Sequence, residues 1–152
     1  RTNQGNLDLC LLRSPKYPDW EADQGRQVFT YAYLPHTGSL TEPNVWSEAV
    51  QLNRAPILLP GRAAKVAAPF SVSGGSVSLE VVQKAEKSDD LVIRLVETAG
   101  SATAATLRTT LSGVKLVETN LIEWEELGSF EFRGDAVELE FKPFEIRTFK
   151  VR

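Results

Sequence analysis

Apolar and polar residues alternate in short segments along the second half of the chain. The alternation is clearest at 77–81 and 137–141, where valine, leucine and phenylalanine are separated by serine or glutamate. Side chains two positions apart on a strand point to the same face, so this period of two predicts strands with one buried and one solvated face. The segment 91–96 is almost continuously apolar and is expected to be an inner strand. Four more apolar segments complete the predicted strands, at 107–111, 114–117, 130–132 and 145–151.

Turn-forming residues separate these predicted strands. Short strands with a turn signal after every 8 to 14 residues, roughly, are typical of an antiparallel sandwich. We therefore predict an all-β fold, an antiparallel β-sandwich, over residues 70–152. The turn segments are rich in glycine, serine, aspartate and arginine and lie at 73–75, 87–90, 112–113, 127–129 and 133–135.

One short helix is predicted, at 43–52. Val45, Trp46, Ala49 and Leu52 are spaced so that they share one face of a helix, and Pro43 suits its first turn. No other segment shows a helical period as clear as this one.

The stretch 54–69 is rich in proline, glycine and alanine and has the weak periodicity of a connector. We expect three parts: residues 1–58, a connector at 59–69, and the sandwich at 70–152. The first part holds two predicted strands and the helix, too few elements to bury their own apolar faces, because an isolated hairpin is marginally stable at best. Four of its side chains are therefore expected to be buried against the rest of the chain or a second copy of it: Phe29, Tyr31, Trp46 and Leu52.

The closing sequence PFEIRTFKVR contains four large apolar residues in two different phases. On a regular strand Phe144 and Ile146 point to one side, and Phe149 and Val151 point to the other. Either both faces of this strand are covered, or a bulge at 147–148 resets the phase. In both cases the strand is expected to be central to the core.

Composition and charge narrow the class of protein. The 152 residues are 42% hydrophobic and 24% charged, as suits one globular domain or one domain with part of another. The net charge of -3 comes from mixed signs without a lysine or arginine run, which argues against nucleic-acid and acidic-membrane surfaces. No apolar stretch approaches the roughly 20 residues of a membrane span, and no signal peptide is recognisable. Because the chain starts at Arg1 and contains no methionine, we expect it to be a piece of a longer protein.

Catalytic chemistry is scarce in the sequence. A zinc site needs three or four converging ligands, and the chain has one histidine, His36, and one cysteine, Cys10. We interpret Cys10 as a buried strand thiol and His36 as a structural residue at a strand end, since no nucleophile motif lies near it. We therefore predict no catalytic residue, metal site or cofactor in this chain. Four glutamates around Trp124 are interpreted as a solvated face: Glu118, Glu123, Glu125 and Glu126.

The irregular loop 13–25 is the most promising place for function. Aromatic faces can stack on a sugar ring, and charged or amide groups can fix its hydroxyls by hydrogen bonds. Loops carry binding residues more often than regular elements do. The alternative is a loop that packs against a neighbouring domain. The residues that suit a sugar are Arg13, Lys16, Tyr17, Asp19, Trp20, Asp23 and Gln24.

Four segments of the chain resemble the C-terminal region of glycoside hydrolase family 38 α-mannosidases, especially the cytosolic and bacterial branch. They are LLRSPKYPDWEADQGRQVFTYAYLPHTG (11–38), VIRLVETAG (92–100), TNLIE (119–123) and PFEIRTFKV (143–151). The resemblance implies that residues 1–58 are the terminal strands and helix of a larger β-supersandwich, and that 70–152 is the small β-domain that follows it.

The same resemblance implies a parent enzyme that hydrolyses terminal α-linked mannose with retention, in the cytoplasm. Its zinc and catalytic carboxylates would belong to an N-terminal domain absent from this chain. The implied partners are that catalytic domain and a mannoside substrate, with a homo-oligomer possible and no nucleic acid or membrane. Arg13, Tyr17 and Asp19 would border the outer part of the mannose pocket.

Two other functions remain open from the sequence. The chain could be an independent carbohydrate-binding module, with Tyr17, Trp20 or Trp124 as a stacking platform. It could also be a structural module that seals a sheet or forms an oligomer interface.

Overall fold

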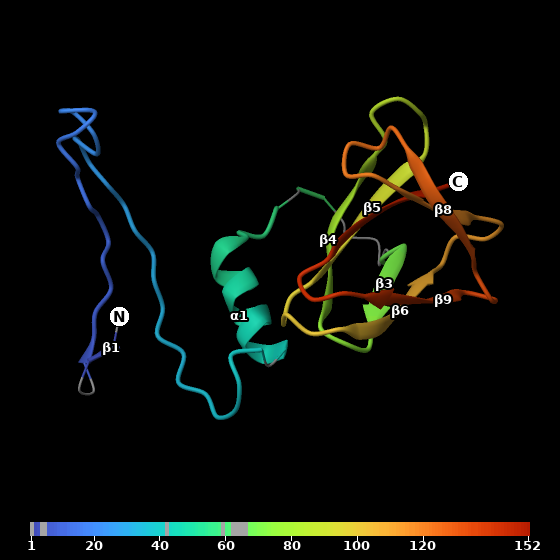
Figure 1. Cartoon of the computed structure of the whole chain (residues 1–152), viewed down its shortest axis with the longest axis horizontal. Helices are drawn as coiled ribbons and strands as arrows, with labels where there is room; N and C mark the ends of the chain where they lie inside the picture. The colour runs from blue at the N-terminus through green and yellow to red at the C-terminus, as the bar shows by residue number, and fades with distance from the viewer. Residues whose placement is uncertain (1, 4–5, 42, 59, 62–66) are drawn as a thin grey trace. The chain divides into compact units, whose positions relative to one another are not determined.

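The computed structural model describes residues 2–3, 6–41, 43–58, 60–61 and 67–152. In the last of these ranges the alternating segments form antiparallel strands (Figure 1). They are β3 (Phe70–Ser73), β4 (Val77–Lys84), β5 (Leu91–Glu97), β6 (Thr103–Thr109), β7 (Lys115–Thr119), β8 (Glu126–Glu131), β9 (Ala136–Phe141) and β10 (Ile146–Val151).

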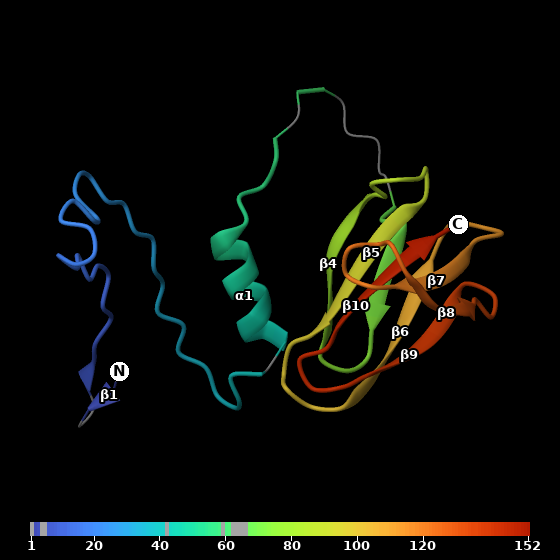
Figure 2. The same ribbon diagram turned by 45° about the horizontal axis from the view of Figure 1, so that its top comes forward.

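These strands form two sheets whose inner faces share one core, which confirms the predicted antiparallel β-sandwich. Five strands make one sheet in the order β4-β5-β10-β7-β8, and three make the other in the order β3-β6-β9. In Figure 2 the C-terminal strand β10 runs between β5 and β7. The last strand of the chain is thus the central strand of the larger sheet, as the sequence predicts.

Alternate residues of both sheets fill the space between them. In the larger sheet Phe149 lies directly opposite Ile93, and Val151 lies opposite Leu116, so these four side chains point to the same face. Each large apolar side chain that is fully buried contributes about 1.5–3 kcal/mol to stability. The buried core consists of Phe70, Ile93, Leu95, Ala105, Leu107, Leu116, Val137, Leu139, Phe141, Phe149 and Val151.

Each of the strands predicted within residues 70–152 is present, and the main differences are one unpredicted strand and the starts of two others. β3 was not predicted, because its sequence FSVS is too short to establish a period. β6 begins at Thr103 rather than 107, since its first residues are threonine and alanine. The predicted turn at 127–129 is wrong, because these residues belong to β8. Gly128 pairs with Glu118 while Glu126 pairs with Thr119, so Leu127 is the extra residue of a β-bulge.

The turn between β3 and β4 requires glycine for two reasons. Gly74 and Gly75 have φ angles of 80° and 60°, a region that residues with a Cβ rarely adopt. A Cβ on Gly75 would also lie 2.7 Å from the carbonyl oxygen of Ala104. The turn signal in the sequence therefore reflects a close approach of two backbone segments.

The predicted helix is confirmed as α1 (Pro43–Asn53). Its last turn is closed by the Asn53 side chain, whose Nδ2 donates to the Ala49 carbonyl oxygen at 2.8 Å. The Arg54 amide donates to the Val50 carbonyl oxygen at 2.9 Å, which satisfies another carbonyl of the last turn.

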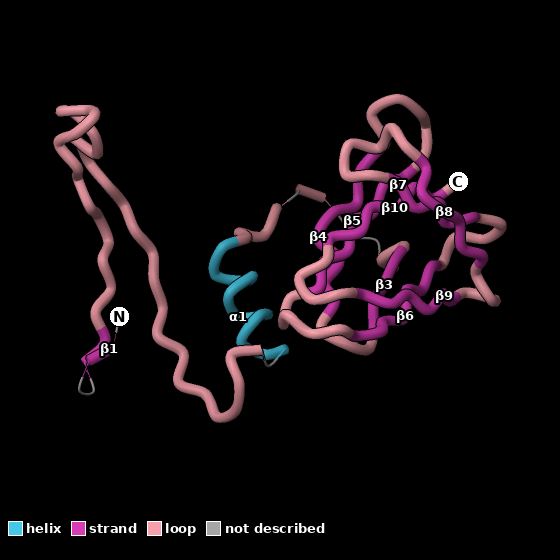
Figure 3. The backbone as a smooth tube through the Cα atoms, in the orientation of Figure 1, coloured by secondary structure: helices cyan, strands magenta, loops and turns pink. Residues whose placement is uncertain are grey.

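The chain divides into two units, residues 1–37 and 38–152. The first unit contains β1 (Thr2–Asn3) and β2 (Asn6–Leu7), and its other described residues are loops and turns (Figure 3). The expectation of two full strands in this part is therefore wrong, because a strand needs a paired neighbour and the described residues supply only a two-residue pair. Cys10 is exposed rather than buried in a strand. The predicted connector includes residues 59 and 62–66, which lie outside the described ranges.

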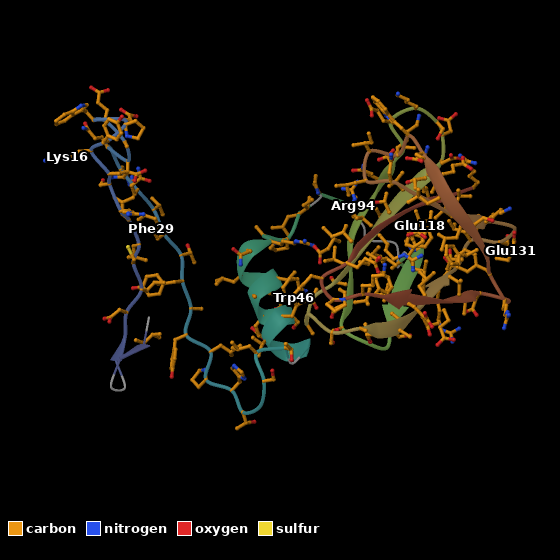
Figure 4. The ribbon with its side chains drawn as sticks, in the orientation of Figure 1. Lys16, Phe29, Trp46, Arg94, Glu118 and Glu131 are labelled. Atoms are coloured by element: carbon orange, nitrogen blue, oxygen red, sulfur yellow. The ribbon has the colours of Figure 1, made fainter. Side chains whose placement is uncertain are left out.

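The four aromatic and apolar side chains expected to be buried are not buried within their own units. Phe29 (labelled in Figure 4) is 44% exposed and Tyr31 is 67% exposed. Trp46 and Leu52 on α1 are 44% and 46% exposed. Burial of Phe29 and Tyr31 against the rest of the chain, and burial of all four side chains against a second copy, stay predictions.

In the closing segment, residues 148–151 are covered on both faces of the strand, whereas Phe144 and Ile146 are exposed. Residues 148–151 are all buried, with Phe149 and Val151 facing the core and the other two facing the opposite side. Both faces are therefore covered here, and the pairing of β10 with β5 runs without a bulge. Phe144 and Ile146 are 70% and 52% exposed, so they are not the buried anchors that their phase predicts.

Candidate functional site

The loop at 13–25 is closed by its own hydrogen bonds. The Ser14 amide donates to Oδ2 of Asp23 at 3.2 Å, which joins the two ends of the loop. Both residues have positive φ angles, 45° and 62°, so they reverse the chain where it enters and leaves the loop. The sequence placed Asp23 among the sugar-binding candidates, but its carboxylate is used to hold the loop together.

Asp19 also stabilises the loop. Its Oδ1 accepts the Glu21 amide at 2.9 Å, and its carbonyl oxygen accepts the Ala22 amide at 3.4 Å. The Gln24 side chain donates to the Trp20 carbonyl oxygen at 3.1 Å. A short aspartate side chain bonding to its own backbone two residues ahead is a common turn device. The carboxylate of Asp19 therefore has one oxygen engaged by the turn.

The aromatic side chains of this loop remain open to solvent. Tyr17 is 87% exposed and Trp20 is 76% exposed, and Arg13 is exposed as well. The structure thus brings Arg13, Tyr17 and Asp19 into one exposed loop. The aromatic rings of this loop can stack on a sugar ring, and the charged groups of Arg13 and Asp19 can form hydrogen bonds with its hydroxyls. His36 is exposed immediately before the bend at 37–38.

Charged groups are also found inside the sandwich. The Arg147 guanidinium forms a two-pronged ion pair with Glu118, with Nε–Oε1 and Nη2–Oε2 distances of 2.7 and 2.5 Å (Glu118 is labelled in Figure 4). The two side chains are only 11% and 19% exposed. The Arg147 Cζ atom lies 5.0 to 5.4 Å from three phenylalanine ring centres, and Nη1 donates to the Glu140 carbonyl oxygen at 2.8 Å. The three rings are those of Phe130, Phe141 and Phe149. Because Arg147 lies on β10 of the larger sheet, and Glu140 and Phe141 lie on β9 of the smaller sheet, this cation joins the two sheets.

Glu97 is a second buried charge, at 1% exposure. Its carboxylate accepts the Ser76 hydroxyl and the backbone amides of Ala99, Gly100 and Phe144, the last three at 2.7 to 2.9 Å. Burial raises the pKa of this carboxyl, but the Ser76 hydroxyl and the backbone amides outweigh burial and lower the pKa from 4.5 to about 2. Glu97 is therefore ionised at neutral pH and ties the turn after β5 to the turn before β10.

The loop 120–125 between β7 and β8 lies over the outer face of the larger sheet, and Figure 2 shows it crossing β10. Asn120 accepts the Trp124 amide on its side-chain oxygen at 3.0 Å, which closes the loop. From the sheet below, Lys150 donates to the Glu123 carbonyl oxygen at 2.9 Å, and Arg94 donates to the Leu121 carbonyl oxygen at 3.3 Å. This loop explains why Lys150 is buried.

The glutamates near Trp124 are not simply a solvated face, so that interpretation is wrong. Glu118 pairs with Arg147 inside the sandwich, and Glu126 pairs with Arg152 at 2.7 Å. Glu123 has a φ of 66° and accepts the Glu86 amide at 3.1 Å. Sequence reasoning missed these roles because the partners lie far away along the chain.

Trp124 has a partner as well. The Lys87 Nζ atom lies 3.7 Å from the centre of its ring, so a cation covers one of the two faces. Tyr17 and Trp20 are therefore better placed than Trp124 to stack on a sugar.

The described residues contain no group of three or more histidine, cysteine, aspartate or glutamate side chains arranged to hold a metal ion. Within the same ranges, none of the helices combines the length and the apolar character that crossing a membrane requires.

Comparison with known proteins identifies relatives of the sandwich and of the whole chain. Residues 76–149 match the family described as glycosyl hydrolases family 38 C-terminal beta sandwich domain. Alpha-mannosidase 2C1 of Mus musculus is 39% identical over 153 residues, which cover 95% of this chain and 15% of that protein. Alpha-mannosidase 2C1 of Homo sapiens is 38% identical over 147 residues, or 92% of this chain and 14% of that protein.

A more distant relative covers the same region. Alpha-mannosidase G of Dictyostelium discoideum is 30% identical over 156 residues, or 96% of this chain and 14% of that protein. The chain thus spans only 14% to 15% of the length of these curated relatives.

Proposed function

Because residues 76–149 belong to the C-terminal β-sandwich domain of glycoside hydrolase family 38, we propose that this chain is a non-catalytic region of an α-mannosidase. The observation that carries the proposal is the similarity to two α-mannosidases over 92% and 95% of the chain, at 38% and 39% identity. The similarity includes the first unit as well as the sandwich, so the two parts are proposed to belong to the same enzyme.

The parent enzyme is proposed to hydrolyse terminal α-linked mannose with retention of configuration, using zinc, in the cytoplasm. The zinc and the reacting carboxylates are proposed to lie outside this chain. One histidine and one cysteine do not make a zinc ligand set, and a retaining glycosidase needs two carboxyl groups about 5–5.5 Å apart. The sandwich would support the catalytic domain, and Arg13, Tyr17 and Asp19 would border the sugar pocket.

The test is hydrolysis of an aryl α-mannoside by the purified 152-residue chain, with and without added zinc. The proposal predicts no turnover above a buffer control under either condition. Turnover that co-elutes with the chain through two different columns would contradict it.

A second candidate function is sugar binding by the loop at 13–25. The exposure of Tyr17 at 87% and Trp20 at 76% favours it, because stacking on a sugar ring needs an open aromatic face. Titration of the chain with methyl α-mannoside, followed by tryptophan fluorescence, tests this function. Saturable binding that disappears in a Trp20→Ala variant and persists in Trp124→Ala would support it.

A further inference from the structure

The sandwich has two open strand edges on the same side. Within the described ranges, β8 is the outermost strand of the larger sheet and β9 is the outermost strand of the smaller sheet, and Figure 3 shows them next to each other. Two hollows of about 630 and 750 Å³ lie along these strands, within the usual size of a ligand site. Phe130 and Glu138 line both hollows, so the two adjoin. We call them together the β8–β9 groove.

The edge of β9 has open backbone groups. Neighbouring residues of an antiparallel strand direct these groups to opposite sides. The Thr109 amide donates to the Asp135 carbonyl oxygen at 2.9 Å, so every second residue from 135 onward bonds to β6, and the backbone groups of Glu138 and Glu140 point away from β6. The Glu140 carbonyl oxygen accepts Nη1 of Arg147, from the larger sheet, at 2.8 Å, which agrees with this direction. In the described part of the chain, the N–H and C=O of Glu138 and the N–H of Glu140 remain available to another strand.

The edge of β8 suits an added strand less well. The bulge at Leu127 interrupts the pairing of β8 with β7, and bulges turn an edge away from further pairing. β9 pairs with β6 over residues 136–141 without a shift in register, so its edge is regular. A strand that enters the groove is therefore expected to pair with β9.

Two carboxylates lie along this regular edge. Glu138 and Glu140 are exposed, and neither forms a salt bridge with another described residue. In an added strand, the residues opposite these glutamates point to the same face, and positive charges there stabilise the pairing. The residue between them points into the groove, where Phe130 and Val137 favour an apolar side chain.

A second copy of the chain does not fit this edge. Pairing of β9 with the β9 of another copy would place glutamates directly opposite or diagonally across from one another, and like charges in such positions are destabilising. The charge of the edge instead complements a basic strand.

We propose that the β8–β9 groove binds an extended peptide segment of another protein, which adds to β9 as a strand and in which lysine or arginine alternates with apolar residues. Strand addition takes its affinity from main-chain hydrogen bonds and its specificity from alternate side chains. The inference rests on the sandwich alone and does not depend on the proposed function.

The test uses a fluorescein-labelled peptide of roughly six residues, the usual length of a strand, in which lysine alternates with valine. One control peptide has glutamate in place of lysine. Another keeps the lysines but has N-methylated backbone amides, which cannot donate to β9. Binding to the 152-residue chain is followed by fluorescence anisotropy.

Two double variants of the chain test the charge of the edge. Glu138→Lys/Glu140→Lys reverses it. Glu86→Lys/Glu125→Lys changes the net charge equally at exposed positions that do not line the groove, and is the matched control. Thermal melting of each variant checks that it remains folded.

The lysine peptide should bind saturably and at least about ten-fold more tightly than either control peptide. Glu138→Lys/Glu140→Lys should weaken this binding at least about ten-fold and allow the glutamate peptide to bind, while the control variant should change the affinity by less than about three-fold. With the lysine peptide bound, nuclear magnetic resonance should show at least about ten-fold slower hydrogen exchange of the Glu138 and Glu140 amides.

Equal binding of the N-methylated peptide, or an equal loss of binding in the two double variants, would overturn the inference, because the attraction would then be non-specific. Slower exchange at Ser129 and Glu131 instead of the β9 amides would overturn it too, since the peptide would then pair with β8. So would failure of the peptide to bind the longer protein to which the chain is proposed to belong, because residues of that protein would then cover the groove.

Discussion

The replacement Phe149→Ala tests the architecture at its centre. Phe149 is fully buried on the central strand β10, and the ring of Phe130 meets its own edge-on at 6.0 Å. Replacing a buried phenylalanine with alanine costs about 3–5 kcal/mol, and the cost is largest where the surroundings cannot collapse into the cavity. β10 is paired on both sides, and Arg147 loses one of its three ring contacts. We therefore expect a loss in the upper half of that range, about 4–5 kcal/mol.

The closing segment supplies its own control, Phe144→Ala. Both phenylalanines lie in PFEIRTF and count equally as apolar anchors in the sequence, but Phe144 is 70% exposed. Its replacement should change the free energy of unfolding by less than about 1 kcal/mol, as is usual for surface sites. Urea unfolding of the 152-residue chain, followed by far-ultraviolet circular dichroism, measures both variants. Equal losses for the two variants, or a loss below about 1 kcal/mol for Phe149→Ala, would show that β10 is not central to the core.

Three further outcomes follow from the sandwich. The pKa of Glu97 is lowered from 4.5 to about 2, so its contribution to stability is present above pH 4.5 and is lost as the pH falls towards 2. When the melting temperature is measured as a function of pH, it should therefore decline less steeply in acid for Glu97→Gln than for the unmodified chain. Gly75→Ala should destabilise the chain more than Gly113→Ala. Both glycines have positive φ, but of the two only Gly75 would place a Cβ against backbone, 2.7 Å from the Ala104 carbonyl oxygen. Equal melting temperatures of the two variants would contradict this. Deletion of residues 143–152 should prevent folding because β5 and β7 would lose the strand between them, and a cooperative transition close to that of the full chain would show that β10 is dispensable.

The strands could be predicted where apolar residues alternate over five or more positions. The segments 77–81 and 137–141 are of this kind, and both lie in observed strands. β3 escaped prediction because four residues cannot establish a period, and Gly128 was assigned to a turn because a β-bulge places glycine inside a strand. For the closing segment the sequence left two alternatives open, cover on both faces or a bulge at 147–148, and the structure shows the first of them for residues 148–151. The sequence did not predict that Phe144 precedes the strand.

The charged interior could not be predicted from the sequence. Glu97 and Arg147 have the residue types of a solvated face. Their burial is favourable because partners far away along the chain, such as Ser76 and Glu118, bind their charges. One signal was available, since Glu97 ends the apolar run 91–96 in a phase that points into the core. The loop residues Arg13, Tyr17 and Asp19 were identified by their chemistry, and their proposed place at a mannose pocket depends on parts of the protein beyond this chain.

The decisive measurement is hydrolysis of an aryl α-mannoside by the parent-length protein, the longer polypeptide to which this chain is proposed to belong, compared with the 152-residue chain at equal concentration. We expect zinc-dependent turnover by the parent-length protein and none by the chain. A parent-length protein that binds zinc and is folded, yet leaves α-mannosides intact or prefers a different glycoside, would contradict it.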